Sequence, residues 1–371
     1  MKLIAIAFVY DLAYHTLRCA RSAGHEIHVL GAATGRGLRV SPRFASYRDL
    51  NYGPERDSFD VAVAEITARI AATGAKCVVP TDIVSTRLLI AIRDRLPIGT
   101  TLLPTADLFD AVNDKQRFAA LCVTHGLPTP ETWLYADGKA VIGALENGTL
   151  RLPLVIKPVI GMGGLGVDLI RSETDLVRVA THKSAPLLVQ RLIEGRDRDI
   201  SILAGGGKLL AYGVQVHQRS RYDFADSPAL LAMMERFVAA TGFEGLAHFD
   251  AIEEAATGNL YLIECNPRSW ASVAALAAAG VNMVALSIVP PTRDLPLHPG
   301  PGVVPIRGAL ARDLLRGRWS RSAFWMVRYY LADPIGILAY YFKFFDDEHA
   351  AVGSMGDQLA GLARVTEDTA A

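Results

Sequence analysis

The first hundred residues repeat one pattern, in which a short apolar run is followed by a stretch with apolar residues at helical spacing. The apolar runs are LIAIAFV, EIHVLGA and KCVVPTD, and the stretches between and after them are YHTLRCARSA, FDVAVAEITARIAA and IVSTRLLIAIRDRL. Such an alternation predicts βαβ units that build an open parallel sheet. No GxGxxG sequence follows the first run, so we expect a Rossmann-like sheet without a dinucleotide site.

The charge balance, the cysteines and the apolar N-terminus limit the classes of protein to which this chain can belong. The 371 residues include 38 basic and 38 acidic side chains, so the overall charge predicts no nucleic-acid partner. The four cysteines show no CxxC spacing, which argues against a disulfide framework or a zinc site and favours a reducing, cytoplasmic compartment. The apolar start is short and is broken by Asp11 and His15, so a first strand is expected rather than a signal peptide.

From about residue 113 the pattern becomes mixed α+β. We expect a helix that begins after Asp114 and stops at Gly126, because aspartate caps helix N-termini and glycine ends helices. DISILAGGGKLLAYGVQVHQ predicts a hairpin turned at 205–207, and a helix over 227–241 follows. GLAHFDAIEE and LYLIECN predict a second hairpin, joined by ATGN.

We therefore expect an α/β (α+β) protein in three parts: residues 1–112 as a Rossmann-like domain, 113–300 as the mixed domain and 301–371 as a helical extension. The extension is dense in aromatic residues and flanked by arginines. Two interpretations of it stay open. Packing on the mixed domain or on a second subunit is favoured, because aromatic side chains form cores, and an interfacial helix on a membrane is the alternative.

The stretch VIKPVIGMGGLGVDLI places Lys157 at the end of one predicted strand, with a glycine-rich turn leading to the next. The glycines of this turn are Gly161, Gly163, Gly164 and Gly166. Glycine lets backbone N–H groups approach phosphate oxygens, and lysine supplies a positive charge. A hairpin that only needs positive φ angles is the alternative. The lysine beside the turn favours a phosphate-binding flap.

The stretch YLIECNPRSW places Glu264, Asn266 and Arg268 at every second position, so their side chains project to one side of a strand. The predicted hairpin brings Asp250, on the preceding strand, beside them. Carboxylate and amide oxygens suit Mg²⁺, and Arg268 is placed to neutralise a transferred phosphoryl group. The alternative is an Asp–Arg ion pair that only holds the hairpin together.

A third stretch, LLVQRLIEGRDRD, joins a predicted strand to a charged run. As an exposed edge, its backbone is suited to hydrogen-bond adenine, and Asp197 downstream is suited to accept hydrogen bonds from ribose hydroxyls. Taken alone, the stretch is better interpreted as a solvated charge run.

In their order along residues 1–290, the motifs NDK, GLPTPET, LVIKP, GMGGLG, VQRLIEG, HFD and ECNPR resemble those of the ATP-grasp superfamily. This is the fold of carbamoyl-phosphate synthetase halves, biotin carboxylase and D-alanine–D-alanine ligase. The resemblance implies a two-lobed ATP-grasp fold whose small flap lobe covers about residues 126–195. It also implies that the protein binds ATP with Mg²⁺, with two ions expected and Mn²⁺ as a substitute.

The resemblance implies a role for each matching residue. Lys115 and Lys157 contact the ATP phosphates beneath the glycine-rich turn, and Arg268 joins Lys157 as a catalytic residue by steadying an acyl phosphate. The adenine hinge, which acts through backbone groups, and the ribose-binding acid after it are Gln190, Arg191, Ile193 and Asp197. The magnesium ligands are Asp250, Glu264 and Asn266. Gln190 and Asp250 stand where many family members have glutamate.

The activity that the resemblance implies is ATP-dependent carboxylate–amine ligation through an acyl phosphate, with ADP and phosphate as products. Kinase-like phosphoryl transfer to a hydroxyl and a non-catalytic nucleotide-binding module are the alternatives. The expected partners are a small carboxylate and an amine, and a homodimer and a peripheral membrane contact through the extension are further options. Candidate substrate contacts are residues 219–221 and Thr81, Asp82 and Ser85, whereas His248 is expected to be structural.

Overall fold

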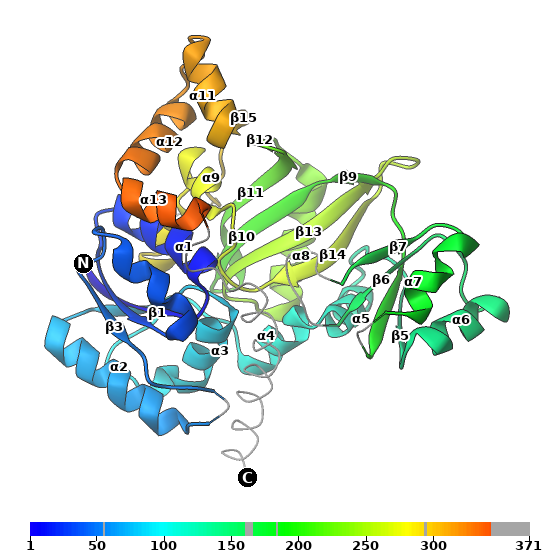
Figure 1. Ribbon diagram of the computed structural model, residues 1–371, viewed down its shortest axis with the longest axis horizontal. Coiled ribbons are helices and arrows are strands. Elements are labelled where there is room, and N and C mark those ends of the chain that lie inside the picture. The colour runs from blue at the N-terminus through cyan, green and yellow to red at the C-terminus, as the bar shows by residue number, and fades with distance from the viewer. Residues whose placement is uncertain (55, 160–165, 183–184, 293–294, 343–371) are drawn as a thin grey trace. The chain divides into compact units, whose positions relative to one another are not determined.

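The computed structural model describes most of the chain (Figure 1). The described residues are 1–54, 56–159, 166–182, 185–292 and 295–342. They belong to two compact units, each with its own hydrophobic core. Both units are built from separate segments: unit 1 from 1–106, 200–248 and 267–371, and unit 2 from 107–199 and 249–266.

Unit 1 begins with the expected parallel sheet, in the order β3-β2-β1-β4. Its strands are β1 Lys2–Ala7, β2 Glu26–Gly31, β3 Ser46–Asp49 and β4 Cys77–Pro80. The connecting helices are α1 Tyr10–Ser22, α2 Phe59–Thr73 and α3 Ile83–Ile92, with short 3-10 segments η1 Ala33–Val40 and η2 Arg93–Arg95. The sequence did not predict β3, because SYRD is polar and stays partly exposed at the sheet edge.

The first strand ends two residues before the end of its apolar run, and α1 begins directly after that run. The amides of Phe8 and Val9 donate to Asp82 Oδ2, at 2.7 and 3.0 Å, rather than to a neighbouring strand. The other oxygen of Asp82 caps α3 by accepting from the amide of Ser85 at 2.9 Å. Thr81, Asp82 and Ser85 are completely buried, so the hypothesis that these side chains contact a substrate is wrong.

An antiparallel sheet follows in unit 1, where the first half of β13 is followed in order by β10, β11, β12 and β15. The elements are β10 Asp199–Gly205, β11 Lys208–Gln218, β12 Arg221–Phe224, α8 Pro228–Thr241, β13 Gly245–Glu254 and β15 Gly302–Pro305. The predicted turn lies at Gly206 and Gly207, whose φ angles of 60° and 75° suit a two-residue hairpin turn. Arg221 pairs with Asp313 at 2.8 Å, so a protein carboxylate already engages this candidate substrate contact.

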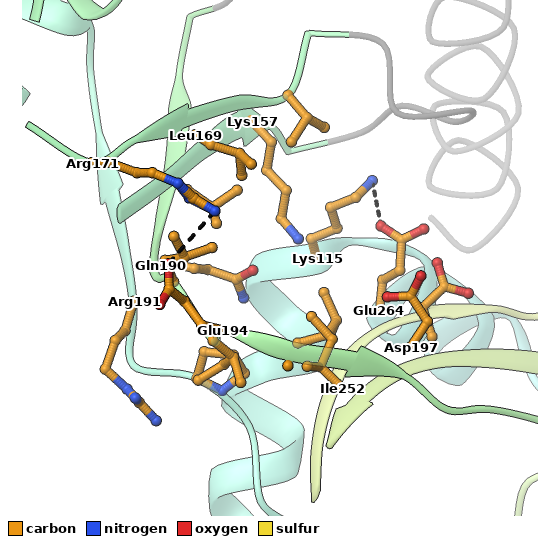
Figure 2. Close-up of a pocket in the computed structure, with 18 of the residues that line it drawn as sticks. Lys115, Lys157, Leu169, Arg171, Gln190, Arg191, Glu194, Asp197, Ile252 and Glu264 are labelled. Atoms are coloured by element: carbon orange, nitrogen blue, oxygen red, sulfur yellow. Dashed lines mark ion pairs between the residues drawn. The ribbon is translucent and has the colours of Figure 1, made fainter. Parts of the chain in front are cut away.

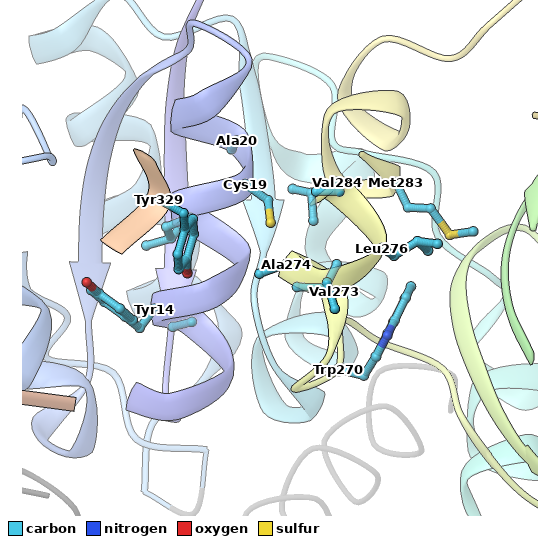
Figure 3. Packing of buried hydrophobic residues seen from close by; sticks show 14 of the residues in the cluster. Tyr14, Cys19, Ala20, Trp270, Val273, Ala274, Leu276, Met283, Val284 and Tyr329 are labelled. Atoms are coloured by element: carbon cyan, nitrogen blue, oxygen red, sulfur yellow. The ribbon is translucent and has the colours of Figure 1, made fainter. Parts of the chain in front are cut away.

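Five helices complete the described part of unit 1: α9 Val273–Ala278, α10 Met283–Ile288, α11 Arg307–Leu315, α12 Arg321–Leu331 and α13 Pro334–Tyr341. Figure 3 shows α1 between two of them, with Cys19 facing α9 and Tyr329 of α12 beside Tyr14. Internal packing, the favoured interpretation of the extension, is therefore confirmed up to residue 342, and 343–371 lie outside the described residues. No helix in the described part of the chain has the length and apolarity to cross a membrane.

Unit 2 contains a four-stranded antiparallel sheet in the order β5-β8-β6-β7. Helices α6 and α7 bury Val141 and Val179 against it (Figure 1). The helix expected after Asp114 is α5, and Gly126 beyond its end has a φ of 62°. The second half of β13 lies between β14 and β9. The elements of unit 2 are α4 Ala106–Asn113, α5 Lys115–Thr124, β5 Thr132–Tyr135, α6 Gly138–Glu146, β6 Leu154–Pro158, β7 Asp168–Ile170, η3 Glu173–Asp175, α7 Leu176–Ala180, β8 Leu187–Arg191, β9 Gly195–Asp197 and β14 Leu260–Asn266.

Candidate active site

Unit 2 contains a cavity of about 600 Å³, and all of its lining residues belong to that unit. Strands β6, β7 and β8 form one side, and α5, β13 and β14 form the other (Figure 2). The residues 190–194, here called the hinge, close one end. Several residues singled out from the sequence line this cavity: Lys115, Lys157, Gln190, Arg191, Ile193, Asp197, Asp250 and Glu264. Its volume is in the range that holds a cofactor-sized ligand.

The start of α5 brings Lys115 to the cavity. Asp114 caps this helix by accepting from the amides of Gln116 at 2.8 Å and Arg117 at 2.9 Å, which fixes the first turn. The Lys115 ammonium lies 3.5 Å from Glu264 Oε2. A positive charge next to a helix N-terminus makes this wall of the cavity favourable for an anion.

Lys157, near the end of β6, points into the same space as Lys115 (Figure 2). Its side chain is only 4% exposed. Burial lowers the pKa of Lys157 to about 8; the charges of Glu264 and Asp250 oppose the shift, and Lys115 adds to it. Two ammonium groups that converge on one cavity repel each other, and a polyanion between them would relieve that repulsion.

Glu264 and Asp250 form the acidic side of the cavity. Burial raises the pKa of Glu264, Lys115 opposes the shift, and Asp250 raises the pKa further through its charge and a side-chain hydrogen bond. The amide Nδ2 of Asn266 lies 3.5 Å from Glu264 Oε1. In this unit Glu264 forms its ion pair with Lys115.

The acidic side has the chemistry of a magnesium site. Asp250, Glu264 and Asn266 offer the hard oxygen donors that Mg²⁺ prefers. Burial and, to a smaller extent, the neighbouring Asp250 raise the pKa of Glu264, and a divalent cation would favour the ionised forms of both carboxylates. A carboxylate oxygen of Asp199 also lies within 4.8 Å of one of Asp250. Asp199 was not predicted from the sequence, although it stands two residues after Asp197 at the start of a predicted strand.

Two side chains of the hinge have partners within the protein. Gln190 donates from Nε2 to the Thr132 hydroxyl at 2.9 Å, so its amide supports β5. The Arg191 guanidinium turns away from the cavity in Figure 2 and pairs with Glu254 at 2.9 Å. The backbone amide of Arg191 donates to Glu131 at 3.0 Å.

Comparison with known proteins identifies one segment of the chain. Residues 112–272 match the family model described as the ATP-grasp domain. This segment is an ATP-grasp domain. The carbamoyl phosphate synthase large chain of Clostridium beijerinckii is 26% identical over 213 residues, which cover 50% of this chain and 19% of that protein. The chain therefore spans only a small part of that relative's length.

Solved structures share the architecture. The biotin carboxylase domain of Hydrogenobacter thermophilus 2-oxoglutarate carboxylase, solved with MgADP, ADP and bicarbonate, has a TM-score of 0.59 at 16% identity and covers 80% of this chain and 71% of its own. L-amino acid ligase from Bacillus licheniformis has a TM-score of 0.59 at 17% identity and covers 78% of this chain and 73% of its own. These similarities confirm the expected α/β fold.

The cavity of the ATP-grasp domain is also lined by residues that were not predicted from the sequence. Apolar side chains line the cavity near the hinge: Val155, Val167, Leu169, Ile252 and Ile263. An ion pair between Arg171 and Glu194, 3.6 Å apart, joins the end of β7 to the hinge (Figure 2). The alternation of side chains along a strand could have predicted part of this apolar lining. Val155 stands two residues before Lys157 on β6, so both side chains lie on the same face of the strand.

The glycine-rich turn of the ATP-grasp domain is described only at its end. Gly166 is exposed and has a φ of 72°, a backbone conformation that favours glycine. Gly161, Gly163 and Gly164 lie outside the described residues. Their assignment to a phosphate flap stays a prediction.

Arg268 and His248 belong to unit 1. Arg268 is 9% exposed, and its Nη1 donates to the carbonyl of Ser269 at 2.9 Å. His248 forms a 2.9 Å hydrogen bond between its Nδ1 and the Ser201 hydroxyl and stacks on Trp270, with ring centroids 5.5 Å apart. These contacts fit the structural role expected for this histidine.

Proposed function

We propose that this protein is an ATP-dependent ligase that joins a carboxylate to an amine through an acyl phosphate and releases ADP and phosphate. The observation that carries the proposal is the convergence of Lys115, Lys157 and Glu264 on one cavity of the ATP-grasp domain. Cations opposite oxygen donors suit phosphoryl transfer, where catalysis depends on positioning and charge neutralisation. The relatives are a synthase, a carboxylase domain and a ligase, which supports an enzyme over a binding module.

The adenine of ATP is proposed to lie against the apolar wall, with its edge at the hinge. Because the Arg191 amide already donates to Glu131, adenine would meet the Arg191 carbonyl and the Ile193 amide. Asp197, which lines the same cavity, would accept hydrogen bonds from the ribose hydroxyls. The phosphates would then lie between Lys115 and Lys157, beneath the glycine-rich turn.

Asp250, Glu264 and Asn266 are the proposed holders of Mg²⁺, with two ions expected and Mn²⁺ as a substitute. When bound, Mg²⁺ neutralises charge on the β- and γ-phosphates. MgADP in the 2-oxoglutarate carboxylase domain supports this for a protein of the same fold. Lys157 would carry a proton on Nζ when ATP is bound. The phosphates favour this charged form and so oppose the lowering of the lysine pKa by burial.

In the proposed reaction, a carboxylate oxygen of the substrate attacks the γ-phosphorus of ATP. The bond from that phosphorus to the β,γ-bridging oxygen breaks, and ADP leaves with the electron pair. The amine then attacks the acyl carbon, loses a proton, and phosphate leaves. Lys157 and Arg268 are the proposed catalytic residues, because each would neutralise negative charge on the transferred group.

The carboxylate and the amine are proposed to be small molecules. A cytoplasmic location is supported by the four cysteines, which all lie in the described part, are buried and form no disulfide. Assembly as a homodimer and the division into domains 1–112, 113–300 and 301–371 stay predictions.

The test is ADP release from Mg-ATP against pooled carboxylates and amines, with hydroxylamine as a trap. ADP release that depends on a carboxylate, together with hydroxamate formation, is the expected result. ADP release that depends on an alcohol or a sugar, with no hydroxamate, would replace the ligase with a kinase-like enzyme. Tight ATP binding with no turnover in any pool would favour the binding module.

A further inference from the structure

The C-terminal helices of unit 1 leave many large apolar side chains in solvent. Helices α11, α12 and α13 lie together in Figure 1, and α12 and α13 contact α1 through Tyr329 and Tyr340. Leu315 is 90% exposed and Leu331 is 73% exposed. The other exposed apolar residues of this segment are Val303, Trp319, Phe324, Ile335, Leu338, Tyr341 and Phe342. Such a concentration is unusual on a monomer surface and marks an interaction site.

The exposed residues follow helical spacing and so form continuous stripes. On α12 the exposed positions are Arg321, Phe324, Arg328 and Leu331, at intervals of three and four residues. The buried side of the same helix carries Ala323, Met326 and Tyr329. Trp319 and Phe324 lie with ring centroids 5.3 Å apart, so the stripe begins with an aromatic pair.

The charges on this surface have one sign. Between residues 302 and 342 every arginine is exposed: Arg307, Arg312, Arg316, Arg318, Arg321 and Arg328. The two acids of the segment are buried, and Asp313 pairs with Arg221 while Asp333 pairs with Arg18. The chain as a whole has zero net charge, so this is a local basic surface rather than a general property.

Residues of the three helices also line an open apolar groove of about 540 Å³. Its lining residues are Arg307, Leu310, Ala311, Leu314, Val327, Tyr330, Leu331, Ile337 and Tyr341. The Arg307 guanidinium lies 5.2 Å from the centroid of the Tyr341 ring, so one cation stands beside the apolar lining. Arg307 also has a φ of 50°, a left-handed conformation that is unusual for a residue other than glycine.

We propose that this face, residues 302–342, lies on a bilayer that contains anionic lipids. Aromatic and aliphatic side chains would enter the boundary between headgroups and acyl chains, and the arginines would meet the lipid phosphates. A second copy of the chain is a poor occupant, because a two-fold contact would set this basic face against itself. A nucleic-acid backbone would match the arginines and leave the leucines in water.

The test is co-sedimentation of the full chain with vesicles of phosphatidylcholine alone or with about 30% phosphatidylglycerol. We expect binding to the anionic vesicles that is at least about tenfold stronger and that weakens as salt is raised. Equal binding to both vesicles, or binding to neither, would overturn the proposal.

Two double variants separate the contributions. Arg321→Glu with Arg328→Glu should lower affinity for anionic vesicles at least about tenfold. Phe324→Ser with Leu331→Ser keeps every charge and should also weaken binding, because the apolar insertion is lost. All four positions are exposed, so the variants should unfold at the wild-type denaturant concentration.

The matched control is Lys139→Glu with Arg151→Glu, which makes the same charge change at exposed positions of unit 2. Its binding should equal that of the wild type. If the control weakened binding as much as the α12 variant, the effect would be one of net charge and the proposal would fail. Self-association of the wild type that the serine variant abolishes, without vesicle binding, would assign the face to a second copy instead.

Discussion

The carboxylate of Asp333 lies 3.4 Å from the guanidinium of Arg18, and both side chains are buried. The same carboxylate accepts hydrogen bonds from the hydroxyls of Tyr14 at 3.0 Å and Ser41 at 2.5 Å. Its other oxygen caps α13 by accepting from the amide of Gly336 at 3.0 Å. One side chain from the C-terminal helices therefore satisfies polar groups of α1 and the segment after η1.

Replacing this carboxylate should destabilise the protein. Asp333→Asn keeps the shape but leaves Arg18 buried without its counter-charge, so we expect a loss of about 3–5 kcal/mol in unfolding free energy. Denaturant titration followed by tryptophan fluorescence measures it. Asp60→Asn is the control, since Asp60 is 80% exposed beside Arg95 and should change stability by less than about 1 kcal/mol. Equal losses would contradict a special role for the buried pair.

Removing single charges from the cavity should stop turnover and leave the fold intact. Lys157→Ala and Glu264→Gln should each lower ATP turnover by at least about a hundredfold. Rates of ADP release, measured beside unfolding curves, test this. Lys139→Ala removes an exposed lysine on α6 and should keep the wild-type rate. A wild-type rate in either cavity variant would remove that residue from the site.

The lowered pKa of Lys157 predicts a pH dependence of ATP binding. Below about pH 8 the free protein already holds the proton on Lys157, so binding takes up none. Above that pH the free lysine is neutral while phosphate favours the ammonium, so binding must take up a proton. The affinity then falls by up to about tenfold per pH unit as pH rises.

Calorimetry in buffers of different ionisation enthalpy measures this uptake. We expect it to grow from near zero at about pH 7 toward one proton at about pH 9. Lys157→Arg keeps its charge throughout this range and should show no uptake from this position. An affinity for ATP that stays constant in the wild type over the same range would show that Lys157 does not bind phosphate.

Gly195 predicts a steric effect next to the hinge. A Cβ at this position would lie 2.0 Å from the backbone oxygen of Glu253, so Gly195→Ala must displace β9 from β13. We expect a loss of about 1–3 kcal/mol in stability and at least about tenfold weaker nucleotide binding, because Glu194 and Asp197 flank the change.

The matched control is Gly143→Ala on α6, where a Cβ would meet no atom within 4 Å. That variant should gain about 0.5–1 kcal/mol, because alanine favours helices. Thermal unfolding and nucleotide titration of both variants give the comparison. A Gly195→Ala protein as stable as the control would mean that β9 shifts without cost.

Local patterns predicted much of the fold and most of the cavity. The hairpin at Gly206 and Gly207 and the helix after Asp114 depend on nearby residues, so the sequence is sufficient to find them. The positions of Lys115 and Lys157 followed from motif order. Contacts between distant segments cannot be predicted from local patterns. Asp82 was wrongly expected to contact a substrate, because its partners Phe8 and Val9 are more than 70 residues away in the sequence.

The contact between α13 and α1 also has a consequence for synthesis on the ribosome. Tyr14 and Asp333 are 319 residues apart, yet they share a hydrogen bond in one core. At about 5–20 residues per second, roughly 15–60 s pass between translation of the two positions. During that time Arg18 on α1 lacks Asp333, the acid that pairs with it in the folded protein. The packing around α1, one of the first helices to leave the ribosome, is therefore completed only when the last described helix has been made. Nascent chains that are halted before residue 333 should bind chaperones more than the complete chain does.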